Sequence, residues 1–298
     1  MSLHRDLGLI ELHGFLSPFN EAAAYRVELF KVWTTIVEIY NKGALAYETD
    51  RLVAIGGIAA EIHHSLKIDY FAGLWRRDFA RQLLWQCLPW NHASRPKKYI
   101  APSWSWASVT GLITYSSPET FRLAAVQDLV NVNDIAVGLE GANPFGQVKG
   151  GLACLEGKLS RLRFGISDLD CQRVGLDKCW AEVWGGEECF VQVWLTISRD
   201  INWIGGTEIP WKHDDLYCLP IQSGPVYSRR VEPLMRGLLL ERIGVTGEFQ
   251  RFGTFSVCGN VSVDMIQAGQ SFDERAGESG LEYAEDGSGG YNYLVKII

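Results

Sequence analysis

The sequence predicts an α+β fold in which an N-terminal helical segment packs on a large antiparallel β sandwich or barrel. Two observations support this prediction. Apolar residues between positions 17 and 95 recur at helical spacing, whereas short runs rich in Val, Ile, Thr and aromatics alternate with Gly, Asn and Asp turns after Pro102. The change of pattern divides the chain into a helical segment, 1–100, and a β domain, 101–298. Strands do not alternate with long helices, which disfavours a doubly wound nucleotide-binding fold.

Three helices are expected in the N-terminal segment. The first follows a turn and cap at 17–20 and ends at 41–43 with a left-handed glycine cap. The second runs from Thr49–Asp50 to about His63–His64, and the third covers Asp78–Cys87 before Pro89. The first helix repeats its apolar residues on one face, at Val27, Phe30, Trp33, Val37 and Tyr40.

Short strands separated by turn residues are expected in the β domain. They are 111–115, 121–126, 151–164, 181–183, 190–197, 215–221, 237–242, 252–257 and 291–298. Near 267–290, six acidic residues from Asp273 to Asp286 precede the glycine-rich stretch 287–290. This composition predicts a mobile acidic loop before the last strand.

Charge and composition exclude several classes of protein. The 298 residues include 28 Lys and Arg against 35 Asp and Glu, a formal net charge of −7, which disfavours nucleic-acid binding. The longest apolar stretch, Leu52–Ala60, is far shorter than the ~20 residues that a membrane span needs, and the N-terminus has no signal-peptide pattern. The seven cysteines form no Cys-x-x-Cys pair. A cytoplasmic protein with reduced thiols and no membrane span is therefore expected.

Motifs for cofactors and metals are not found in the sequence. It contains no phosphate-binding Gly-rich loop, no Gly-x-Ser-x-Gly and no His-x-x-x-His. His63 and His64 are adjacent, so on a helix they point about 100° apart and cannot share a metal. Neither a cofactor nor a metal is expected.

The candidate binding residues come from the high aromatic content of 11 Trp, 11 Tyr and 13 Phe. Trp104 and Trp106 are two residues apart, so on a strand both indoles would face one side. They would form either a stacking platform for a ligand or an aromatic strip packed against a helix, and the second is favoured. Trp203 and Trp211 flank a glycine turn, and tryptophans in loops are less easily explained by core packing.

One histidine is the candidate catalytic group. His213 precedes Asp214 and Asp215, and neighbouring carboxylates can raise a histidine pKa and suit it to general acid or base chemistry. The alternative is a polar turn before a strand, and this is favoured. If a site exists here, His213 donates a proton or hydrogen bond. Trp203, Trp211 and Tyr217 then surround the mouth of the β region, and Trp104 and Trp106 form a wall.

Several stretches are similar to one known family. They are 47–59 (YETDRLVAIGGIA), 70–75 (YFAGLW), 81–85 (RQLLW) and, most specifically, 101–108 (APSWSWAS), with weaker likeness at 216–220, 237–241 and 249–253. They resemble the region that follows the HET domain in fungal heterokaryon-incompatibility proteins. The likeness covers residues 25–115 well and 150–258 loosely. The signature blocks of the HET domain are missing, so its death-signalling activity is not implied.

Two functions are consistent with these observations. The first is a cofactor-independent cyclase or isomerase, of pericyclase or Diels–Alder type, that acts on an apolar polyene, terpenoid or polyketide intermediate of fungal secondary metabolism. Such catalysis requires only a pocket that orients the substrate and one or two hydrogen-bond donors. The alternative is a non-catalytic ligand- or protein-binding module of a HET-type incompatibility system. The cyclase is narrowly favoured, because a small-molecule pocket is the usual role of a large, aromatic-rich domain.

Overall fold

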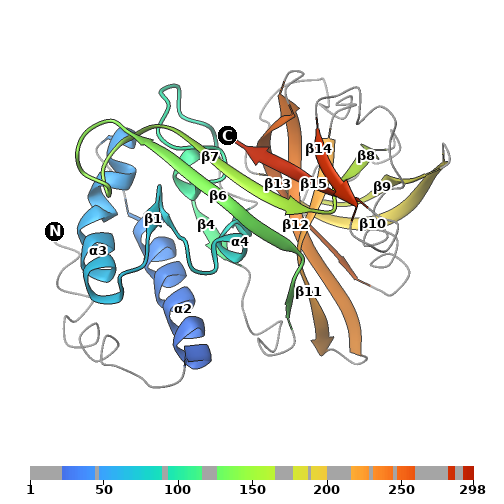
Figure 1. The fold of residues 1–298 in the computed structure, drawn as a ribbon, viewed down its shortest axis with the longest axis horizontal. Helices are drawn as coiled ribbons and strands as arrows, with labels where there is room; N and C mark the ends of the chain where they lie inside the picture. The colour runs from blue at the N-terminus through green and yellow to red at the C-terminus, as the bar shows by residue number, and fades with distance from the viewer. Residues whose placement is uncertain are drawn as a thin grey trace.

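The computed structural model describes 22–43, 47–88, 93–115, 126–164, 177–186, 189–199, 216–227, 231–243, 247–258, 281–285 and 291–298. Within these residues, helices of the N-terminal segment lie beside one large, mostly antiparallel sheet (Figure 1). The predicted α+β class is confirmed.

The first two predicted helices are present. Helix α2 (Ala22–Asn41) buries Trp33 and Val37, and helix α3 (Arg51–Leu66) follows the 3₁₀ turn η2 (Glu48–Asp50). The predicted left-handed glycine after α2 is wrong, because Gly43 has no positive φ. The left-handed residue instead follows α3, where Lys67 (φ 53°) donates its N–H to the carbonyl of His63.

The third predicted helix is correct only in its first part. Helix α4 ends at Gln82 (Phe79–Gln82), and Trp85–Cys87 forms strand β3, which pairs with β4 (Ile113–Tyr115). Phe79, Leu83 and Leu84 are buried as expected, although α4 ends before Leu83. The helical spacing of these apolar residues is therefore also compatible with a single helical turn followed by a strand. A short hairpin, β1 (Tyr70–Phe71) with β2 (Leu74–Trp75), precedes α4.

The large sheet contains eleven strands from the described residues, in the order β10-β9-β8-β11-β12-β13-β15-β7-β6 with β14 on β15 and β5 on β11. The strands are β5 (Gln127–Asp128), β6 (Val130–Leu139), β7 (Val148–Gly157), β8 (Ser160–Phe164), β9 (Asp177–Gly186), β10 (Cys189–Arg199), β11 (Leu216–Tyr227), β12 (Val231–Ile243), β13 (Glu248–Cys258), β14 (Glu282–Glu285) and β15 (Tyr291–Ile297). All pairs are antiparallel except β13 with β15. Although β10 also pairs with β13, the sheet as a whole is not a closed barrel, since it continues through β15 and β7 to β6.

Three details differ from the predicted strands. The predicted strand 151–164 is two strands, β7 and β8, which separate at Lys158–Leu159. Strand β6 was missed, because its exposed Asn131, Asn133 and Asp134 have the composition of a turn. Strand β14 lies inside the predicted acidic loop and pairs with β15. The predicted strand 121–126 falls almost wholly outside the described residues.

The central strands β11 and β12 are buried on both faces. Tyr217, Leu219 and Leu238 belong to the main core, whereas Leu216 and Leu239, which alternate with them, are fully buried on the opposite face. Burial on both faces explains the nearly continuous apolar run of β12. The main core also contains residues of α2 and α3, so it is continuous between the helices and the sheet.

The end of β15 leaves an opening in the sheet. The pairing of β15 with β7 stops at Ile297 and Ala153, while β7 continues back through Gly151 and Gly150 to Val148. The long β6–β7 hairpin runs from the sheet across to α3 (Figure 1), where Phe145 packs against His63. In the described part of the chain, no helix is long and apolar enough to span a membrane.

Candidate functional site

Residues 101–108 form a buried turn beneath this opening. The segment is not the strand on which both indoles would share a face, because Trp106–Ser108 is a 3₁₀ helix, η3, capped by the Ser105 hydroxyl. That hydroxyl accepts the Ala107 N–H (3.1 Å) and donates to the Ala72 carbonyl (2.5 Å). Serine hydroxyls that bond locally to the backbone favour such a turn over a strand.

The two tryptophans of this turn are fully buried. The indole N–H groups of Trp106 (2.9 Å) and Trp33 (3.0 Å) both donate to the carbonyl of Gly73. Trp106 meets Tyr40 of α2 edge to face, and Trp104 meets Phe79 of α4 in the same way. The structure therefore places both residues in aromatic packing against helices, and neither lines the pocket described below.

The other predicted site residues do not come together in the described part of the chain. Tyr217 lies in β11, is only 9% exposed, and meets Phe249 of β13 edge to face. It belongs to the core and does not line the pocket. Trp203, Trp211 and His213 lie outside the described residues, so their proposed roles stay predictions.

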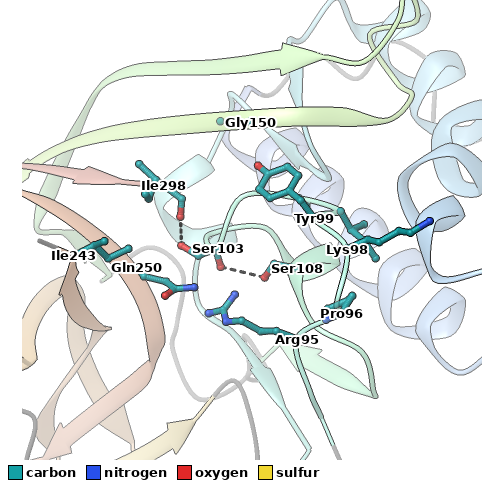
Figure 2. Close-up of a pocket in the computed structure, with 13 residues that line it drawn as sticks. Arg95, Pro96, Lys98, Tyr99, Ser103, Ser108, Gly150, Ile243, Gln250 and Ile298 are labelled. Atoms are coloured by element: carbon teal, nitrogen blue, oxygen red, sulfur yellow. Dashed lines mark hydrogen bonds between the residues drawn. The ribbon is translucent and has the colours of Figure 1, made fainter.

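The opening beyond β15 is a pocket of about 440 Å³. Its walls are the segment before η3, the glycines of β7, and the ends of β12, β13 and β15, as Figure 2 shows. The volume lies within the range of small-molecule sites. The lining residues are Arg95, Pro96, Lys98, Tyr99, Ile100, Ala101, Ser103, Ser108, Gly150, Gly151, Ile243, Gln250 and Ile298.

Backbone hydrogen bonds fix the floor of the pocket. Both the N–H (3.0 Å) and the hydroxyl of Ser103 donate to the backbone oxygen of Ile298, and Ser108 donates its hydroxyl to the Ser103 carbonyl (3.3 Å). The Ser103 hydroxyl also accepts the Arg251 N–H (3.0 Å). Three segments distant in sequence, the turn 101–108, strand β13 and the C-terminal Ile298 after β15, therefore meet at one serine, which gives the pocket a rigid base.

One side of the pocket is cationic. Arg95 is half-buried, and its Nη2 donates to the carbonyl of Arg251 at 2.6 Å. Lys98 is exposed, and Figure 2 shows its amino group directed away from Arg95; neither cation has a carboxylate partner among the described residues. No acidic side chain belongs to the described lining. The side chains of the described lining thus carry positive charge, in a chain whose net charge is negative.

Arg251 supports this cationic side from below. Its side chain is buried, its guanidinium lies 3.3 Å from the centroid of the Trp85 ring, and it donates to the Trp85 carbonyl. A guanidinium stacked on an indole is held in one orientation. Because Arg95 binds the Arg251 backbone, the position of Arg95 is set by the core.

The described lining residues include no side chain that exchanges protons near neutral pH. They contain no His, Asp, Glu or Cys side chain, and partial burial raises the pKa of Tyr99 to about 12. A general acid or base needs a pKa near the working pH. The arrangement suits binding of an anion better than proton transfer.

No metal centre is found in the described residues, which contain no group of three or more His, Cys, Asp and Glu side chains able to hold an ion. His63 instead interacts through Nδ1 with the carbonyl of Ile68 at 2.7 Å, and its ring contacts Phe145.

Two signals of the pocket were visible in the sequence. The pair Lys97–Lys98 has the composition of a solvated surface, and the doublet Gly150–Gly151 lacks the spacing of a phosphate loop. Neither pattern alone indicates a site, because only the fold brings Lys98 and Gly150 to the same pocket.

Comparisons of the chain with protein-family models, with curated proteins and with solved structures give no match. The pocket itself is therefore the basis for a proposed function.

Proposed function

We propose that the protein is a ligand-binding module and that the pocket beyond β15 binds a small molecule through an anionic group. The observation that carries this proposal is the half-buried guanidinium of Arg95 in a described lining that has no acidic side chain. The resemblance of 101–108 to the region after the HET domain is consistent with a recognition role, since this turn forms the pocket floor.

Arg95 is the main anion-binding group in this proposal. One of its N–H groups is used by the Arg251 carbonyl, and the others have no partner within the described part of the chain. A half-buried guanidinium can bind a carboxylate or phosphate bidentately, with little loss of side-chain freedom because it is already anchored. Lys98 adds a more solvated charge at the mouth.

The test is isothermal titration calorimetry with benzoate and with inorganic phosphate at low ionic strength. At least one of them should bind, and its Kd should rise about two- to fivefold in Lys98→Ala, the effect of one partly screened charge. Lys97→Ala is the matched control, because Lys97 is the exposed neighbour and does not line the pocket.

The proposal is contradicted if neither probe binds. It is also contradicted if Lys97→Ala and Lys98→Ala weaken binding equally, because the anion would then be attracted only by the general surface charge. A thermal denaturation curve of each variant establishes that both remain folded.

The cyclase hypothesis stays a prediction. Three of its site residues, Trp203, Trp211 and His213, lie outside the described residues, and the described pocket has a cationic rather than an apolar side. It is tested by deleting the gene in its host and profiling metabolites. An uncyclised precursor that accumulates would support catalysis, and an unchanged profile would rule the cyclase out.

A further inference from the structure

The pocket pairs its cationic side with a slot between an aromatic ring and glycine backbone. Tyr99 is 53% exposed and has no ring contact or hydrogen bond in the described part of the chain. Figure 2 shows its ring projecting from the segment before η3 toward Gly150 on β7. A large aromatic side chain that faces an opening without packing partners is suited to contact a ligand.

The wall opposite Tyr99 has no side chain. A Cβ atom on Gly150 would meet no heavy atom within 4 Å, so open space adjoins this residue. Its neighbour Gly151 is different, because a Cβ there would lie 2.3 Å from Pro102 Cγ and 3.2 Å from Trp104. Close packing of the turn 101–108 therefore explains Gly151. Neighbouring residues of a strand face opposite sides, so the open space at Gly150 lies on the other face of β7, and it is the backbone of Gly150 that lines the pocket.

We infer that the ligand is a planar aromatic acid. Its ring lies between Tyr99 and the backbone at Gly150, and its carboxylate is bound by Arg95. This inference rests on the proposed function, since it specifies the body of the anion that the pocket binds. Flat rings stack on tyrosine and can approach a glycine backbone closely, and both surfaces are present here.

The experiment compares three probes by calorimetry on the full chain: 2-naphthoate, decahydro-2-naphthoate and inorganic phosphate. The two carboxylates share charge and carbon skeleton, but only the first is planar. We expect 2-naphthoate to bind about three- to tenfold more tightly than its saturated analogue, the effect of one good aromatic contact. Tyr99→Leu should remove this difference between the two carboxylates.

A second variant tests the carboxylate contact. Arg95→Gln should weaken the binding of 2-naphthoate by about tenfold or more, because it removes a charge-assisted hydrogen bond to the carboxylate. Lys97→Gln is the matched control, since Lys97 is exposed and does not line the pocket.

The possible outcomes separate the inference from the proposed function. If both carboxylates bind equally, or phosphate binds as tightly as 2-naphthoate, the planar ligand is wrong and anion binding stands. If Arg95→Gln and Lys97→Gln bind 2-naphthoate like the unchanged protein, its position in the pocket is wrong. If none of the three probes binds, both the inference and the proposed function are overturned.

Discussion

Two adjacent glycines of α3 provide a matched test of how this helix packs against the β6–β7 hairpin. Gly56 is buried, and a Cβ there would lie 2.5 Å from the carbonyl oxygen of Phe145 and 3.3 Å from its Cβ. Gly57 is exposed, and a Cβ there would meet no heavy atom within 4 Å. Alanine substitution therefore changes the helix equally at both positions but adds a clash at only one.

The magnitudes follow from this geometry. Replacing an interior helix glycine with alanine stabilises a protein by about 0.5–1 kcal/mol, so Gly57→Ala should be more stable than the unchanged protein. Gly56→Ala gains the same term but must displace the Phe145 backbone. Overpacking of this kind costs about 1–3 kcal/mol. The propensity term cancels between the two variants, so their difference in free energy of unfolding should be about 1–3 kcal/mol.

Urea denaturation followed by tryptophan fluorescence measures this difference, and the 11 tryptophans provide the signal. The slope of free energy against urea should be the same for both variants, because neither changes the surface exposed on unfolding. Equal stability of Gly56→Ala and Gly57→Ala would refute the reasoning, since it would mean that the hairpin does not rest on Gly56.

Three further predictions concern the core. Trp106→Phe should lower the free energy of unfolding by about 1–3 kcal/mol, because it loses a buried hydrogen bond to Gly73, and calorimetry should show an unchanged Kd for 2-naphthoate; a weakened Kd would instead favour a role for Trp106 in the site. Gly237→Ala should lower the melting temperature, because its Cβ would lie 2.2 Å from the Leu219 carbonyl oxygen and overpacking costs about 1–3 kcal/mol or more; an unchanged melting temperature would contradict this. Burial raises the pKa of the Cys218 thiol in the folded protein from 9.0 to about 12. The stabilisation of the folded state by the neutral thiol is therefore complete below pH 9 and is lost as the pH rises toward 12. Urea titrations from pH 8 to 11 should therefore show a free energy of unfolding that falls from about pH 9 in the unchanged protein and from a higher pH in Cys218→Ala. Identical pH profiles of the two proteins would mean that Cys218 does not cause the fall.

Local patterns predicted the elements that depend on local interactions. Helices α2 and α3 follow from the three- and four-residue spacing of their buried side chains, such as Trp33 and Val37. Most of the later strands follow from β-branched runs between turns. The α+β class is thus accessible from the sequence alone.

Long-range pairing accounts for the errors. Trp85–Cys87 forms a strand because Trp85 pairs with Tyr115, and Trp104 and Trp106 sit in a turn because Ser105 bonds to Ala72. Neither Tyr115 nor Ala72 lies within the short stretch of sequence from which local structure is predicted. Secondary-structure propensity is weak enough that such contacts override it.

The pocket could not be predicted for a related reason. Arg95, Gly150 and Gln250 are separated by more than 50 residues in sequence, and they meet only because β7 continues past the end of β15. Trp104 and Trp106, which the sequence suggests as a possible wall of the site, instead pack in the core beneath the pocket.

The most direct test of the proposed binding site is the position of a bound planar acid. A crystal of the protein soaked with 6-bromo-2-naphthoate locates the ligand by the anomalous scattering of bromine. We expect a bromine peak inside the pocket, with the naphthyl ring between Tyr99 and Gly150 and the carboxylate at Arg95. Bromine bound elsewhere on the protein, or a carboxylate directed away from Arg95, would contradict it.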